Sequence, residues 1–444
     1  MVSSKEPSQL LGNLLFPKIF QTFRMSIQPT KLIITSVALA VICLAGWLMD
    51  FSKTVVATKG TSTKLTELDI YMTNQSQLGS YIESFREKDQ GIGVFSTLWH
   101  FSAKKFQGAV DSVFALDVPG VIGNITDFFK AAAWALRYHP TYCIIFFIII
   151  LSVISISGGA VCRIAALQFA RGEKPGLTEA LRFSIKRFTS FFTTPLAPVG
   201  IIIFIGLFIF LLGLAGNIPR AGEIIVGLGM PLALFAGVLV AVIVIGAVAG
   251  FNLMFPAVAY DGSDCFDAIS RSFSYVYARP WRMITYTVIA AVYGSICYMF
   301  VRIFAFLSLW ITHWLLQLGV WVDNGSSEVN KLTAIWPKPV FVKLLGSSEP
   351  IATNWTESVG VFLVYLFVLV VVGLVVSFII SFYFSANTII YSLMRNTVDN
   401  TALSDIYMHF EETEIEPPTT ELLPQEEQPS PESKSQPDES SSQQ

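Results

Sequence analysis

Hydrophobic residues along the chain gather in six long runs, separated by segments in which polar residues are frequent. A helix rises 1.5 Å per residue, so about 20 apolar residues cross a hydrocarbon layer roughly 30 Å thick. The pattern therefore predicts an all-α integral membrane protein with about six transmembrane helices. The runs cover residues 32–49, 142–162, 198–218, 224–251, 283–301 and 359–384.

The predicted spans divide the chain into segments of different character. Before the second span, apolar residues recur at helical spacing, which predicts a mainly helical extracytoplasmic cap. The last residues are rich in Glu, Pro, Ser and Gln and cannot bury enough apolar surface to fold. The predicted segments are a cytoplasmic N-terminal segment (1–31), transmembrane helix 1 (32–49), the cap (50–140), a duplicated membrane region (141–320), an extracytoplasmic loop (321–358), transmembrane helix 6 (359–386), a cytoplasmic amphipathic segment (387–410) and a disordered acidic tail (411–444).

Basic residues near the predicted spans indicate the orientation, because short cytoplasmic segments carry an excess of Lys and Arg. Basic residues cluster before the first span, after the second and after the fourth, whereas the hairpin over residues 217–223 holds only Arg220. We therefore expect a protein of the plasma (inner) membrane with its N- and C-termini in the cytoplasm.

Arg302 makes the fifth span ambiguous, because a further apolar stretch with three tryptophans follows it over residues 303–322. An arginine at the bilayer centre costs about 2.5–3.5 kcal/mol. We therefore place Arg302 at the outer interface and expect residues 303–322 to form an interfacial or partly re-entrant helix. The alternative is a seventh span, which would place the C-terminus outside.

An internal duplication links the second to the fifth span at a constant offset of 88 residues. In both copies a span leads into a turn and then into an amphipathic helix, which we expect to lie in the plane of the cytoplasmic interface. Parallel repeats occur in transporters but are not confined to them. The pairs include Gly158 with Gly246, Ala180 with Ala268 and Ser184 with Ser272.

Two short motifs carry a resemblance to a known family. One is Asp-Ala-Ile-Ser-Arg-Ser at residues 267–272, and the other is the closing segment over residues 390–399. Over about residues 142–407 the chain resembles uncharacterised bacterial multi-pass membrane families related to the membrane domain of glycerophosphodiester phosphodiesterases. The phosphodiesterase barrel has no counterpart here, so the resemblance implies a fold type and membrane residence, not an enzyme activity.

Residues for catalysis or metal binding are not apparent in the sequence. The four histidines are dispersed, and the five cysteines match no zinc or redox spacing. We expect no enzyme activity, no cofactor and no metal site. The net charge of −3 combines an acidic tail with a mildly basic remainder, which gives no nucleic-acid signal.

Polar residues within or near the spans are few: Arg163, Asn252, Asn387 and Arg302 are the candidates for a polar lining if the protein is a transporter. The favoured prediction is a non-enzymatic scaffold or accessory subunit, whose partners are the lipid bilayer and proteins that contact the cap and tail. The alternative is a transporter or channel for a small or lipid-like solute. A membrane-bound enzyme acting on lipid head groups is the third interpretation. A continuous polar cavity would favour transport, and a closely packed bundle would favour the scaffold.

Overall fold

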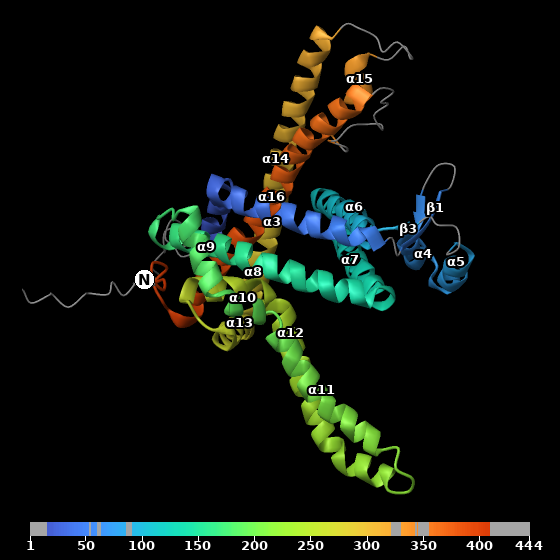
Figure 1. The fold of residues 1–444 in the computed structure, drawn as a ribbon. Helices are drawn as coiled ribbons and strands as arrows, with labels where there is room; N and C mark the ends of the chain where they lie inside the picture. Colours follow the sequence, from blue (N-terminus) through green and yellow to red (C-terminus); the bar gives the residue numbers. More distant parts are fainter. Residues whose placement is uncertain are drawn as a thin grey trace, which may run out of the picture. The chain divides into compact units, whose positions relative to one another are not determined.

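The computed structural model describes residues 16–52, 55–59, 64–85, 91–320, 330–341, 344 and 355–408 (Figure 1). The predicted acidic tail over residues 411–444 and most of the predicted loop over residues 321–358 lie outside the described residues. Every element named below belongs to the first of two compact units, Met1–Tyr407, the second being Met408–Gln444.

Six helices are long and apolar enough to cross a membrane, which confirms the predicted all-α, multi-pass fold class. Proline occupies the first turn of four of them, where its fixed backbone angle suits the helix and its missing N–H is not needed. The six are α3 (Pro29–Met49), α8 (Pro140–Arg171), α11 (Ala197–Ala215), α12 (Gly222–Asp261), α14 (Pro280–Gly319) and α16 (Trp355–Asp399).

The protein core lies where the C-terminal halves of α8, α12 and α16 pack together. Small residues allow this close approach: a Cβ atom on Gly158 of α8 would lie 2.5 Å from the ring of Phe384 on α16. Shorter helices surround the core, and the ring of Phe191 is fully buried among them. They are η1 (Phe16–Gln21), α2 (Thr22–Ser26), α9 (Leu177–Lys186), α10 (Phe188–Thr193) and α13 (Cys265–Ala278).

The prediction of a separate interfacial or partly re-entrant helix after Arg302 is wrong. Helix α14 runs without interruption from Pro280 to Gly319 and lies beside α16 (Figure 1). Residues 303–318 contain neither Gly nor Pro, so nothing in the local sequence ends the helix. Residues 303–319 therefore continue α14, and they form neither a separate interfacial helix nor a seventh span that turns back.

The predicted amphipathic segment over residues 387–410 is also corrected. Helix α16 continues to Asp399, and residues 384–395 are buried on every side rather than on one face. The helix ends at Asn400, whose φ of 55° turns the chain back. The N–H of Tyr407 then donates to the carbonyl of Tyr260 at 3.0 Å, which places the returning segment against the end of α12.

The cap combines helices with a small sheet that the sequence did not indicate. Strands β1 (Val55–Lys59), β2 (Lys64–Thr66) and β3 (Gly91–Ile92) form an antiparallel sheet in the order β2-β1-β3. A cluster that includes Val55, Leu68 and Trp134 is its hydrophobic core. The remaining elements of this region are η2 (Asp50–Ser52), α4 (Glu67–Thr73), η3 (Gln75–Gln77), α5 (Leu78–Phe85), α6 (Val94–Phe114) and α7 (Val118–Tyr138), and the short α15 (Lys331–Ile335) precedes α16.

The two segments assigned to the duplication share an element order. Helix α8 ends at Gly172 and α12 at Gly262, both in the left-handed conformation that glycine adopts readily, and α9 and α13 follow. Gly246 and Gly250 of α12 face Phe273 of α13, so this closely spaced glycine pair serves packing within the chain. The 88-residue duplication and the in-plane orientation of α9 and α13 remain predictions.

Candidate functional site

Of the four predicted polar residues, Arg163 and Asn387 are buried in the packed core, and Asn252 is half-buried on α12. The Nη1 atom of Arg163 donates to the carbonyl of Ala259 at 3.0 Å. The Oδ1 atom of Asn252 accepts a hydrogen bond from the Tyr383 hydroxyl at 2.6 Å. Asn387 is 6% exposed within α16. The hydrogen bonds of Arg163 and Asn252 join neighbouring helices. None of the three residues is among the described lining residues of the cavity at Arg302.

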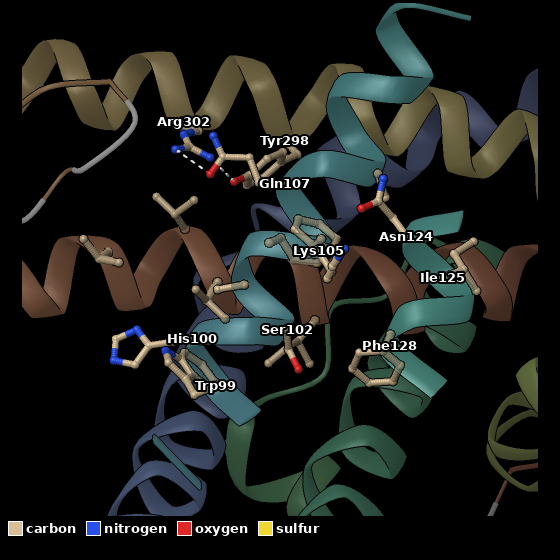
Figure 2. Close-up of a pocket in the computed structure, with 18 of the residues that line it drawn as sticks. Trp99, His100, Ser102, Lys105, Gln107, Asn124, Ile125, Phe128, Tyr298 and Arg302 are labelled. Atoms are coloured by element: carbon tan, nitrogen blue, oxygen red, sulfur yellow. Dashed lines mark hydrogen bonds between the residues drawn. The ribbon is translucent and has the colours of Figure 1, made fainter. Parts of the chain in front are cut away.

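Arg302, the fourth predicted residue, lines a large cavity of about 1070 Å³ between the cap helices α6 and α7 and the long helices α14 and α16 (Figure 2). Most of its lining residues are apolar. Helix α16 contributes aliphatic side chains, and α6 and α7 contribute aromatic ones. The apolar lining residues include Val372, Val375, Val376 and Ile379 from α16 and Phe106, Phe128 and Phe129 from the cap.

Helices α6 and α7 form a closely packed antiparallel pair that makes one wall of the cavity. The chain reverses at Leu116, whose φ is 56°, and the Asp117 carboxylate then accepts from the N–H of Gly120 at 3.1 Å, which caps α7. An ion pair of 2.7 Å joins Lys105 of α6 to Asp127 of α7. The hydrogen bond from Lys105 lowers the pKa of Asp127.

Asp50 fixes the base of this pair to the membrane helices. Its carboxylate follows α3 and accepts the backbone N–H groups of Phe95 and Ser96, each at 2.9 Å, in the first turn of α6. A carboxylate is favoured there because the first N–H groups of a helix have no partner within it. The hydroxyl of Tyr142, at the start of α8, donates to the same carboxylate at 3.4 Å. One acidic side chain thus ties α3, α6 and α8 together.

A polar group lies on one side of the cavity, around Arg302. Its Nη1 atom donates to the Tyr298 hydroxyl at 2.7 Å, and its Nη2 atom donates to Gln107 Oε1 at 3.3 Å and to the Phe341 carbonyl at 3.0 Å. Figure 2 shows Arg302, Tyr298 and Gln107 together, with Phe128 and Ile125 elsewhere on the wall. The contact with Gln107 joins α14 to the cap, which explains why the charge does not interrupt α14.

The two resemblance motifs meet around Asp261 at the end of α12. The Asp261 carboxylate pairs with Arg271 from the first motif and Arg395 from the second, each at 3.2 Å, and accepts a hydrogen bond from Tyr391. Beside it, the Tyr275 hydroxyl donates to Asp399 at 2.5 Å. Burial, followed by this hydrogen bond, raises the pKa of Tyr275. The groups satisfy one another, so we interpret this ionic cluster as a structural joint.

Sequence reasoning missed a buried lysine. The side chain of Lys31 is fully buried, and its Nζ donates to Gln168 Oε1 at 3.1 Å and to Ser385 Oγ at 3.4 Å. Ser385 continues a line of serines on α16: Ser377 bonds Ser36 at 3.0 Å, and Ser381 donates to the carbonyl of Ser26 at 2.9 Å. The four-residue spacing of these serines was the available signal. Lys31 lies just before the first predicted span, where a basic residue is expected from the excess of Lys and Arg on the cytoplasmic side, so its burial was not predicted.

Within the residues that the structure describes, no three His, Cys, Asp or Glu side chains are grouped so that they could hold a metal ion. Comparison of the chain with protein-family models, with curated proteins and with solved structures finds no match. The fold alone therefore defines the class, a multi-pass helical membrane protein. The resemblance to the membrane domain of glycerophosphodiester phosphodiesterases stays a prediction.

Proposed function

We propose that the protein binds a lipid-like amphiphile in the cavity between α6, α7, α14 and α16, as a carrier or transporter of such molecules. The observation that carries this proposal is a mostly apolar cavity of about 1070 Å³, part of whose wall belongs to two helices apolar enough to cross a membrane. Ligand pockets typically measure about 300–1,000 Å³, so this cavity suits a large ligand.

The turn between α6 and α7 supports access from the bilayer rather than from water. Phe114, Leu116 and Val118 are exposed there, and Leu116 is 87% exposed. Adjacent exposed apolar side chains on a cap that otherwise has its own hydrophobic core indicate contact with an apolar partner. In this proposal the turn between α6 and α7 inserts into the outer face of the bilayer. The protein lies in the plasma membrane, with both termini in the cytoplasm.

The scaffold or accessory-subunit prediction rests on the cap and the acidic tail as contact surfaces for proteins. That role does not require a cavity, whereas amphiphile binding explains the cavity and its apolar lining. Of the sequence-based alternatives, a lipid-like solute therefore fits better than a small polar one, because Arg163 and Asn387 are buried in the core and Asn252 is bonded to Tyr383.

The experiment is to purify the full chain from membranes and identify bound lipids by native mass spectrometry. The double substitution Ala103→Trp and Val376→Trp fills the cavity from both walls. The matched control, Val238→Trp and Val248→Trp, places two tryptophans on α12 where the valines are 63% and 76% exposed. We expect bound lipid to be lost in the cavity variant and kept in the control. Equal lipid in both variants would refute the proposal.

A further inference from the structure

We propose that the α6–α7 pair is a lid over the cavity, which swings about its base to admit and release the amphiphile. This inference rests on the proposed amphiphile binding and adds the device that controls access to the same site. The pair forms one wall of the cavity, and residues of α14 and α16 line much of the rest (Figure 2).

Both connections of the pair to the rest of the chain lie at one end. Helix α6 begins at Val94 and α7 ends at Tyr138, and these ends are neighbours because the two helices are antiparallel. Val94 and Trp134, near these ends, are fully buried in the hydrophobic core of the cap. At the opposite end, Leu116 is almost fully exposed. The pair is therefore a hairpin with a buried base and an exposed tip.

The base of the hairpin is firmly held against α3. The Asp50 carboxylate accepts from the backbone N–H groups of Phe95 and Ser96, and also from the Ser96 hydroxyl at 2.7 Å. Hydrogen bonds to an ionised acceptor are about twice as strong as those between neutral groups. Gly46 of α3 lets the Phe95 ring approach closely, since a Cβ atom there would lie 2.4 Å from it. These contacts make the base the pivot of the lid.

The far half of α6 meets α14 through a small patch, which we call the closing contact. The rings of Phe106 and Tyr298 lie 5.4 Å apart between centroids, and Val110 packs in an apolar cluster with Ala305. The hydrogen bond from Arg302 to Gln107 is long at 3.3 Å. The closing contact thus consists of Phe106, Gln107 and Val110 of α6 against Tyr298, Arg302 and Ala305 of α14.

The closing contact can part without disrupting either side. The hydrogen bonds of Arg302 to Tyr298 and to the carbonyl of Phe341 do not involve the hairpin, so the guanidinium keeps acceptors when α6 moves away. Within the hairpin, the ion pair between Lys105 and Asp127 joins α6 to α7. The two helices therefore move as one body.

The cavity reaches the molecular surface along α7. Phe128 and Phe129 belong to its lining, and their side chains are 47% and 66% exposed. The apolar residues of the tip, Leu116 and Val118, are exposed on the same hairpin. A lid whose tip inserts into the bilayer opens toward lipid rather than toward water, as the proposed function requires.

The first test locks the closing contact with a disulfide. The full chain carries Val110→Cys and Ala305→Cys, and the partly exposed Cys43, Cys143 and Cys265 are replaced by alanine. Neither Val110 nor Ala305 is among the described lining residues, so the cavity keeps its wall. The probe is phosphatidylglycerol in mixed micelles, and bound lipid is followed by native mass spectrometry. Oxidation should stop uptake by the delipidated protein and trap lipid that was loaded before, and reductant should reverse both effects.

The matched control combines Ala305→Cys with Val371→Cys. It uses the same α14 cysteine but joins it to α16, within the same apolar cluster and outside the described lining. This bond fixes α14 to α16 and leaves the hairpin untouched. Uptake and release should therefore proceed as in the reduced protein.

A distance measurement keeps the test independent of disulfide formation. One pair of spin labels replaces Leu116 at the tip and Leu315 on α14, and a reference pair replaces Leu136 near the base and Leu315. All three side chains are exposed, so the labels fit. We expect phosphatidylglycerol to shorten and narrow the distances between positions 116 and 315 and to leave those between positions 136 and 315 unchanged. If a cysteine pair fails to close, this measurement decides.

Unchanged uptake and release in the oxidised Val110→Cys and Ala305→Cys variant would overturn the lid, as would an equal loss in the control. Identical tip distances with and without lipid would overturn it as well. In the first and third outcomes lipid still binds, and in the second the reduced proteins still bind it, so the proposed function stands. Failure of the unmodified protein to take up any lipid would instead refute the proposed function itself.

Discussion

Replacement of Asp261 by Asn should destabilise the protein more than any single change at its surface. The Asp261 carboxylate is 6% exposed and pairs with Arg395, whose side chain is 10% exposed, and with Arg271, whose side chain is 38% exposed. Breaking a buried ion pair by removing one partner costs about 3–5 kcal/mol, because the other charge stays buried. The pair with Arg271 is more exposed and adds at most about 1 kcal/mol.

Asp267→Asn is the matched control for this prediction. Asp267 also pairs with Arg271, at 3.0 Å, but its side chain is 45% exposed. Such a pair within one helix contributes about 0.3–0.5 kcal/mol. Thermal unfolding of the full chain in detergent, followed by tryptophan fluorescence, should show a large fall in Tm for Asp261→Asn and a small one for Asp267→Asn. Similar shifts for the two variants would show that the cluster around Asp261 is not the joint described here.

Three further predictions concern other contacts. Asp50→Ala removes the acceptor for the first turn of α6 and should lower stability by about 1–2 kcal/mol, seen as a lower Tm and faster proteolysis of the cap; unchanged proteolysis would contradict it. Lys31→Met should leave Tm unchanged or raise it, because a buried amine with neutral partners gives way to an apolar chain of similar length, whereas a large fall would show that the charge is required. The pKa of Asp127 is lowered from 3.8, so its contribution to stability is present above that pH and is lost as the pH falls further through the folded value. The Tm of the unmodified protein should therefore drop more than that of Asp127→Asn on acidification below about pH 4, and parallel curves would contradict the assignment.

The membrane helices were predictable because each requirement is local. About 20 consecutive apolar residues are sufficient to indicate a span. A proline in the first turn marks the start of α3, α8 and α14. The course of α14 was not predictable in the same way. Its charge at Arg302 is satisfied by Gln107, 195 positions earlier, and by a carbonyl 39 positions later, and no local pattern contains those partners.

The burial of the C-terminal part of α16 on all sides was also not predictable from the sequence. Residues 387–399 follow an apolar run and contain polar side chains, which read as an amphipathic segment. In the structure the same polar groups are engaged by distant residues, such as Tyr260 with Ser392 and Asp261 with Arg395. Their partners lie on α12, so only the packed fold shows that this part of α16 is internal.

The cavity was only partly foreseeable. Arg302 stands out in any apolar run, but the sequence favours an interfacial anchor for it. The aromatic residues of α6 and α7 recur at helical spacing, and that spacing is the same whether they fill a core or line a cavity. The distinction depends on how the pair docks on α14 and α16, which Asp50 and Gln107 determine through contacts far apart in the sequence.

Crosslinking from within the cavity tests the central claim most directly. A photoreactive amino acid at Val376, on the cavity wall, is activated in native membranes, and the purified protein is weighed by mass spectrometry. The same residue at Leu116, on the exposed turn, reports contact with bulk lipid. The account predicts one discrete lipid adduct at Val376 that the substitution Ala103→Trp removes. No lipid adduct at Val376, or one that this substitution leaves unchanged, would contradict it.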